Sequence, residues 1–118
     1  KEDFVEHQYD EIHQMFELTD DALTQMNSLL TNRREAGDVH RSFNIEKEIN
    51  SYRNQLRTEN INAVNNHEYD YGIGTMFMDL IQECEKLGDY VVNVVEARMG
   101  VREPEPEDSM PSKIAMAS

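Results

Sequence analysis

The segment that decides the fold lies in the second half of the chain, where residues 77–96 read FMDLIQECEKLGDYVVNVVE. Apolar side chains recur there every three or four positions, at Phe77, Leu80, Cys84, Leu87, Val91 and Val94 or Val95. This is the period of an α-helix that buries one narrow face. We therefore predict a helix over about residues 74–99 that ends at Gly100, although the cluster of four valines alone would also suit a strand.

The same period continues upstream and predicts two more helices. The first covers about residues 3–35, and its apolar positions are Val5, Ile12, Phe16, Leu23, Met26 and Leu30. The second covers about residues 39–65, with apolar positions at Ile45, Ile49, Tyr52, Leu56 and Ala63. Gly37 is expected to end the first helix and Asp38 to cap the second. Residues 69–74 are expected to form a loop.

The connections between these helices are short, which is typical of antiparallel neighbours. A chain of 118 residues suits one domain. The prediction is an all-α, up-down-up three-helix bundle over residues 1–100. Residues 101–118 are rich in Pro and Glu and are expected to form an extended tail, in which Met110, Ile114 and Met116 are the side chains that could dock.

Charge limits the classes of partner. The chain has 11 basic and 24 acidic residues, giving a net charge of −13. Such a charge repels nucleic acids and anionic membrane surfaces, so neither is expected as a partner. A single cysteine allows no internal disulfide and favours a reducing compartment. The chain begins at Lys1 and holds no apolar run of membrane-spanning length. We expect any membrane association to come through a missing N-terminal part.

Acidic side chains form a row beside the apolar positions of the third helix. Glu85 and Asp89 are four residues apart and therefore share a helix face. Glu46 and Asn50 repeat this spacing on the second helix. Carboxylate and amide oxygens accept divalent or iron-type cations, so these four residues are candidate metal ligands. The alternative is a solvated acidic face. Gly88 between the two acids indicates close approach of a ligand or of another helix.

Two arginines extend the row on the second helix. Arg53 and Arg57 could neutralise the acids of the third helix, or they could form a small anion site. No nucleophile–base arrangement is visible, and Cys84 lies on the apolar face, where a thiol packs as a small hydrophobe. We therefore expect no catalytic residues and no enzymatic activity.

The stretch from Glu85 to Glu96, EKLGDYVVNVVE, resembles the third-helix signature of PhoU-like domains. It is most similar to the domain at the C-terminus of bacterial sodium/phosphate cotransporters. The stretches from Glu46 to Arg57 and from Glu68 to Asp79 also resemble that subgroup, and the likeness spans roughly Ile12 to Arg98.

The resemblance implies three-helix units and a role in phosphate uptake and its regulation. It also implies metal binding through paired acidic motifs, which Glu85 and Asp89 match in full. On the second helix Glu46 matches, but Asn50 stands where the family has Asp, and Tyr90 stands where it often has His. The resemblance further implies a place on the cytoplasmic side of the bacterial inner membrane, attached to a transmembrane transporter domain. Because free-standing members carry two units, it suggests a homodimer here.

Two other functions stay open at the level of sequence. One is a metal-binding module centred on the four candidate ligands. The other is a free-standing PhoU-type regulator that contacts an uptake ATPase and a sensor kinase. Several apolar spans upstream of Lys1 would exclude the free-standing regulator.

Overall fold

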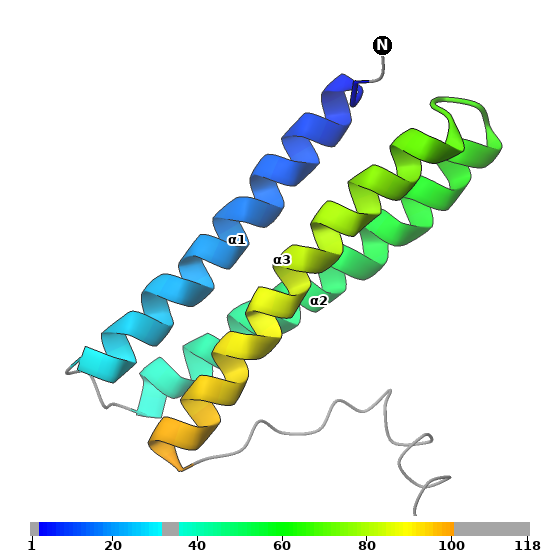
Figure 1. The fold of residues 1–118 in the computed structure, drawn as a ribbon. Helices are drawn as coiled ribbons and strands as arrows, with labels where there is room; N and C mark the ends of the chain where they lie inside the picture. Colours follow the sequence, from blue (N-terminus) through cyan, green and yellow to red (C-terminus); the bar gives the residue numbers. More distant parts are fainter. Residues whose placement is uncertain (1–2, 32–35, 101–118) are drawn as a thin grey trace, which may run out of the picture.

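The chain is described here from a computed structural model, which describes residues 3–31 and 36–100. It contains three helices, α1 (Glu6–Thr31), α2 (Ala36–Asn65) and α3 (Tyr71–Met99), and no strand within those ranges. The three helices lie side by side, and α2 is antiparallel to α1 and to α3 (Figure 1). The predicted up-down-up three-helix bundle is confirmed. The predicted tail, with Met110, Ile114 and Met116, lies outside the described residues.

The helix ends follow from local hydrogen bonds. At the start of α1, the backbone N–H of Val5 donates to Gln8 Oε1 at 2.9 Å. At the start of α3, Asp70 is the N-cap and its Oδ1 accepts from the Ile73 N–H at 3.0 Å. Gly100 ends α3 with a φ of 72°, a conformation that costs glycine nothing. The predicted end at Gly100 is therefore correct.

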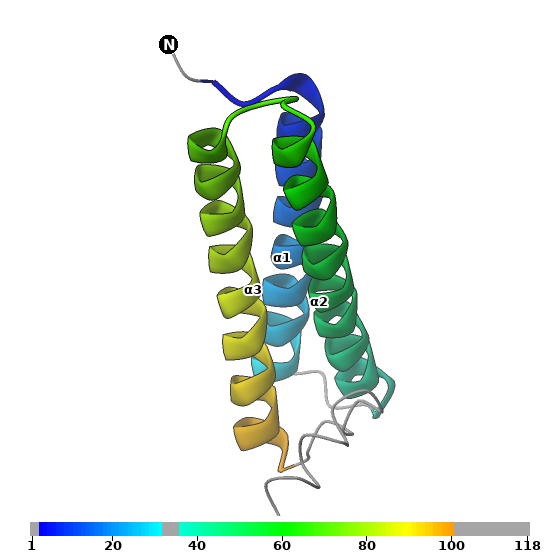
Figure 2. The same cartoon turned by 90° about the vertical axis from the view of Figure 1, so that its right-hand side faces the viewer.

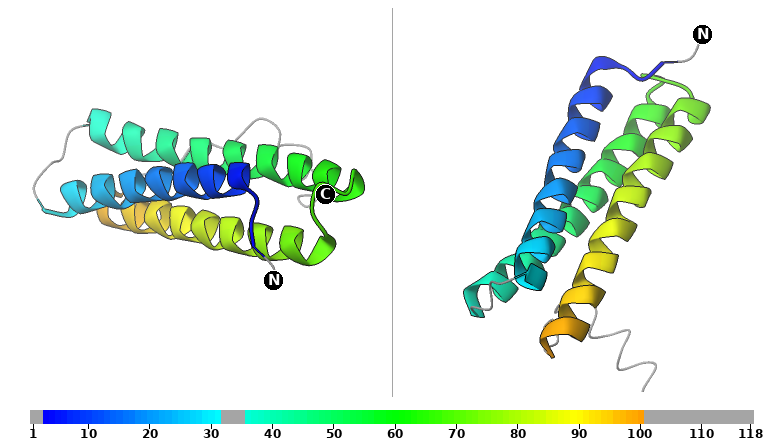
Figure 3. Two further views of the ribbon diagram at one scale, coloured as in Figure 1. Left: turned by 90° about the horizontal axis from the view of Figure 1, so that it is seen from above. Right: turned by 60° about the vertical axis from the view of Figure 1, so that its left-hand side comes forward.

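The turn between α2 and α3 contains a histidine whose backbone adopts the left-handed conformation. His67 has a φ of 63°. Its N–H donates to the Val64 carbonyl at 3.0 Å, and the N–H of Glu68 donates to the Ala63 carbonyl at 2.9 Å. This pair of bonds is the Schellman motif that satisfies the last carbonyls of a helix. It turns the chain toward the start of α1, as the view from above shows (Figure 3).

Several predicted boundaries differ from the structure. Residues 3–5 precede α1 rather than belonging to it. Helix α2 begins at Ala36, so Gly37 and Asp38 lie inside its first turn instead of ending one helix and capping the next. Helix α3 begins at Tyr71, so most of the predicted loop over residues 69–74 is helical. Cap signals depend on single residues and locate a helix end only to within about a turn, whereas hydrogen bonds fix it.

The core lies between the three helices, each of which packs against the other two; a second view shows the three side by side (Figure 2). Its apolar members are Ile12, Met15, Ala22, Leu29, Phe43, Ile49, Leu56, Phe77, Ile81, Cys84, Val91, Val92 and Val95. Two predicted core residues are wrong, because Phe16 is 48% exposed and Leu87 is 45% exposed. Apolar side chains span a wider part of the surface of α1 and of α3 than the neighbouring helices cover. Periodicity alone cannot tell which edge of that apolar surface faces the core.

Helices α2 and α3 approach each other at two glycines. A Cβ atom on Gly88 would lie 3.2 Å from Ile49 Cδ1, and one on Gly74 would lie 2.8 Å from Val64 Cγ2. Gly88 therefore marks a close approach of another helix, one of the two alternatives that its position allowed. Among the described residues, no helix is both long enough and apolar enough to cross a membrane.

Candidate functional site

The acidic row predicted on α3 lies along its contact with α2. Arg53 Nη1 lies 3.6 Å from Glu85 Oε1, and both side chains are mostly buried. Asp89, one turn further along α3, is exposed. The structure thus places a cation from α2 against the first acid of the row. This is the ion-pair arrangement for Arg53, rather than an anion site in which its charge would be unpaired.

Glu85 has an unusual environment for a carboxylate. Burial raises its pKa above the ordinary value, and the negative charge of Asp89 raises it further. The positive charges of Arg53 and Arg57 oppose this effect without cancelling it. The ionised form of Glu85 is consequently disfavoured at this contact even with Arg53 beside it.

The other two candidate ligands bond to each other. Asn50 Nδ2 donates to Glu46 Oε2 at 2.5 Å, across one turn of α2. Glu46 is only 6% exposed. Within the described part of the chain, Asn50 Oδ1 is buried and has no hydrogen-bond partner. A buried amide oxygen of this kind is a ligand type that hard cations accept.

The four candidates nevertheless do not form a complete metal centre as they stand. Over residues 3–31 and 36–100, no group of three or more His, Cys, Asp or Glu side chains is placed to hold an ion. Arg53 already supplies positive charge to Glu85. A cation held by Glu85 would compete with this guanidinium for the carboxylate. The metal site therefore stays a prediction.

A second polar cluster, which the sequence did not predict, lies where the start of α1 meets the α2–α3 turn. His7 Nε2 lies 2.5 Å from Glu68 Oε2, and His7 Nδ1 lies 3.3 Å from Glu11 Oε2. Nearby, the Tyr69 hydroxyl donates to Asn60 Oδ1 at 2.7 Å. The imidazole thus joins two elements that are 61 residues apart in the chain. The spacing of His7 and Glu11 signals half of this cluster, and only the fold supplies Glu68.

Electrostatics in this cluster favour a protonated histidine. Burial lowers the pKa of His7, but hydrogen bonds to Glu68 and Glu11 and the charges of both acids outweigh it, so the pKa is raised above 6.5. Burial also raises the pKa of Glu11, although His7 opposes the change. Burial, followed by the charges of Glu11 and Glu59, raises the pKa of Tyr52. This end of the bundle therefore carries an excess of negative charge around one imidazole.

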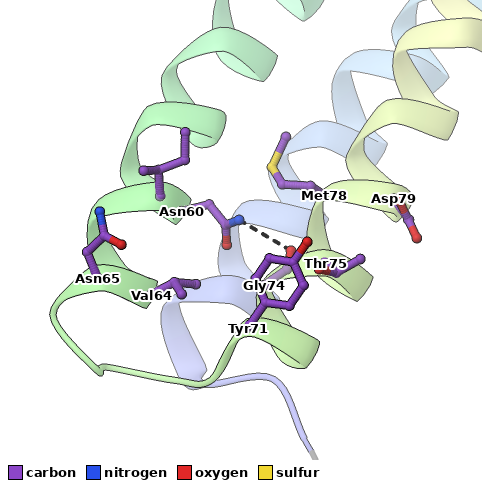
Figure 4. Close-up of a pocket in the computed structure, with 9 residues that line it drawn as sticks. Asn60, Val64, Asn65, Tyr71, Gly74, Thr75, Met78 and Asp79 are labelled. Carbon is purple, nitrogen blue, oxygen red and sulfur yellow. Dashed lines mark hydrogen bonds between the residues drawn. The ribbon is translucent and has the colours of Figure 1, made fainter.

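The same end of the molecule has a cleft of about 290 Å³ between the last turns of α2 and the first turns of α3 (Figure 4). Asn60 Nδ2 reaches across its floor and donates to the Gly74 carbonyl at 3.3 Å. The cleft is mostly apolar and is lined by Asn60, Ile61, Val64, Asn65, Tyr71, Gly74, Thr75, Met78 and Asp79. None of these residues was predicted as a site, because they carry no chemical motif and the cleft forms only where α2 and α3 come together.

The remaining histidine contact is a surface pair. His13 Nε2 lies 3.2 Å from Glu17 Oε2, and both side chains are largely exposed. Cys84 is buried, and burial raises the pKa of its thiol. A buried thiol of raised pKa packs as a hydrophobe and is a poor nucleophile.

Comparison with known proteins gives one match. The sequence model of a protein family described as PhoU domain matches residues 12–97. That range takes in α1 from Ile12 onward, the whole of α2, and α3 up to its last turn. No curated protein matches the chain, and no solved structure matches it.

Proposed function

The chain belongs to the PhoU domain family, and on that premise we propose that it is the regulatory domain of a sodium-dependent phosphate transporter. Membership of the family implies a role in the regulation of phosphate transport. The finer proposal is that the domain lies on the cytoplasmic side of the bacterial inner membrane, joined to a transmembrane transporter domain. It would act through protein contacts and without chemistry of its own.

One observation carries this proposal, namely the family match across all three helices. Within the matched range, the stretch from Glu85 to Glu96 resembles the transporter-linked subgroup most closely. The packing of α3 supports a contact role, because Glu85 is held by Arg53 while Asp89 stays exposed beside it. A partner protein can recognise a charged row of this kind by electrostatic complementarity, without any covalent bond being made or broken.

The parent gene and phosphate uptake test this proposal. The gene should encode apolar spans upstream of Lys1. Deleting the codons for residues 12–97 should leave sodium-dependent uptake of labelled phosphate but abolish its response to excess phosphate. His13→Gln, which alters an exposed surface pair, is the matched control and should keep the response. Uptake that does not need sodium, or a response that survives the deletion, would contradict the proposal.

A second candidate is a metal-binding regulator of the PhoU type, and the buried oxygen of Asn50 favours it. Glu46, Asn50, Glu85 and Asp89 would hold a divalent or iron-type cation, which would compete with Arg53 for Glu85. Elemental analysis of the purified chain, and thermal melting with and without EDTA, test this directly. Bound metal together with a lower Tm in EDTA supports it. Asp89→Ala should then abolish both effects, and an unchanged Tm with no bound metal rules it out.

The homodimer also remains a proposal, in which a second copy supplies the second three-helix unit of larger family members. Sedimentation equilibrium on the whole chain measures it. A single species of monomer mass at all accessible concentrations would contradict it.

A further inference from the structure

Exposed apolar side chains gather on one face of the bundle. In the described part of the chain, the large exposed hydrophobic side chains of α1 and most of those of α3 are Tyr9, Phe16, Met76, Leu87 and Tyr90. Single exposed apolar residues are ordinary, but a contiguous patch on a small domain marks an interaction surface. The question is therefore whether these five residues lie together.

On α1 the exposed residues lie on the side that faces α3. Tyr9, Phe16 and Leu23 are seven residues apart, so they form one line along the helix. Asp21 and Gln25 mark the opposite side, because they line a polar cleft against α2. Thr19, whose hydroxyl lies beside the Cys84 thiol of α3, is next to the Phe16 line.

On α3 the three exposed residues Met76, Leu87 and Tyr90 lie on the side that faces α1. Gly74, Glu85 and Gly88 mark the side that contacts α2. Met76, Leu87 and Tyr90 lie on the other flank of the helix, in line with Leu80, which packs partly against the core. Helices α1 and α3 run in the same direction and pack against each other (Figure 1). The two lines therefore flank the contact between these helices, and we call the exposed apolar surface that they form the α1–α3 groove.

Acidic side chains interrupt both lines of the α1–α3 groove. Asp20 lies between Phe16 and Leu23 on α1, and Glu83 lies between Leu80 and Leu87 on α3. Both are exposed, and the neighbouring Lys86 offsets only Glu83, at 3.1 Å. The chain as a whole carries a charge of −13. A partner must therefore present apolar side chains to the exposed hydrophobic residues and basic side chains to the acids among them.

We propose that the α1–α3 groove binds a basic amphipathic helix from a partner protein. Its apolar side chains, at spacings of three and four, would cover Phe16 and Leu87, and its Lys or Arg side chains would meet Asp20 and Glu83. The helix would complete a four-helix bundle with the existing three. A second copy of this chain fits less well, because it would bring acidic edges against acidic edges, and an anionic membrane is repelled for the same reason. This contact does not depend on the proposed link to a transporter.

A labelled synthetic peptide tests the proposal on the whole 118-residue chain. The probe is a helix of about three heptads with Leu at the first and fourth positions and Lys at the edges. Fluorescence anisotropy should show saturable binding that weakens with salt. A peptide with Glu in place of Lys, and one with the Leu positions scrambled, should each bind about tenfold more weakly or not at all.

Variants then locate the site. Phe16→Ser and Leu87→Ser should each weaken binding by about tenfold, since truncated anchor residues commonly cost that much. Asp20→Asn and Glu83→Gln should weaken it less and reduce its salt dependence. Ile61→Ser and Tyr71→Ser are matched controls, because both residues are exposed apolar side chains that line the cleft between α2 and α3. Circular dichroism melting should show that all six variants fold.

Three outcomes would overturn the proposal. One is that Phe16→Ser and Leu87→Ser bind the peptide like the parent chain, or that the controls weaken binding equally. Another is a concentration-dependent dimer that Phe16→Ser dissociates, which would make a second copy the occupant. The last is binding to vesicles containing phosphatidylglycerol that Leu87→Ser abolishes, which would make the groove a lipid-binding surface.

Discussion

Gly88 of α3 lies so close to Ile49 of α2 that a methyl group on it would come within 3.2 Å of Ile49 Cδ1. The contact is made by the end of a side chain, which can move by a few tenths of an ångström. A small substituent should therefore be tolerated, whereas a large one has no room. This relationship sets the spacing of the two helices that carry the acidic row.

Gly88→Leu should destabilise the fold by about 1–3 kcal/mol, because the added side chain overpacks the contact with Ile49. Gly88→Ala should be nearly neutral, since a gain in helix propensity of up to ~1 kcal/mol offsets the tight contact. Urea unfolding measures both. Gly72→Leu is the control, because its nearest neighbour would lie 3.6 Å from a Cβ atom. Equal losses at the two glycines would contradict the close approach.

Ile81→Ala should cost about 2–5 kcal/mol, because Ile81 is fully buried in the core. Leu87→Ala, although it removes as many carbon atoms, should cost less than about 1 kcal/mol, because Leu87 is exposed in the α1–α3 groove. Denaturant unfolding of the two variants gives the comparison. A larger loss at Leu87 than at Ile81 would mean that the core face of α3 is misplaced.

The contacts of His7 should make stability depend on pH. Its pKa is raised in the folded state, so its contribution is fully present below 6.5 and is lost as the pH rises through the folded-state value. The acids must stay ionised, and the pKa of Glu11 is itself raised above 4.5. The difference in Tm between the parent chain and His7→Gln should therefore be largest between these limits and shrink at alkaline pH. A difference that grows with pH would contradict the assignment.

His67→Gly should stabilise the fold by about 1 kcal/mol, because a left-handed backbone strains every residue that has a Cβ atom. His67→Ala keeps the strain and removes only the imidazole, so it serves as the control and should change little. Thermal melting of the two variants separates backbone strain from side-chain contacts. If the alanine variant were as stable as the glycine variant, strain at this turn would not be the reason.

Arg53→Met should destabilise the fold by about 1 kcal/mol, because it leaves Glu85 beside Asp89 without its nearest positive charge. Glu85→Gln should restore most of that loss in the double variant, since it removes the charge that Arg53 compensates. A double-mutant cycle in denaturant measures the coupling. Additive losses would show that Arg53 and Glu85 do not interact.

Sequence alone determined the number of helices and their antiparallel order. Apolar positions at spacings of three and four run through all three segments, and the predicted breaks between them, at about residues 36–38 and 66–73, are short. It also determined that Glu85 and Asp89 share a helix face, because that depends on spacing within one helix, whereas Gly88 alone left open whether a ligand or another helix approaches it. These features are local, so the period of the helix is enough to predict them.

Only the tertiary structure decided which edges of the apolar helix surfaces are buried and which polar residues meet. Phe16 and Leu87 belong to surfaces that the sequence predicted to be core, yet they are exposed in the α1–α3 groove. Glu68 meets His7, and Arg53 meets Glu85, across gaps in the chain that no local pattern spans. The physical reason is that periodicity gives the direction of a side chain relative to its own helix axis. Its surroundings depend on the rotation and offset of the neighbouring helices, which packing alone sets.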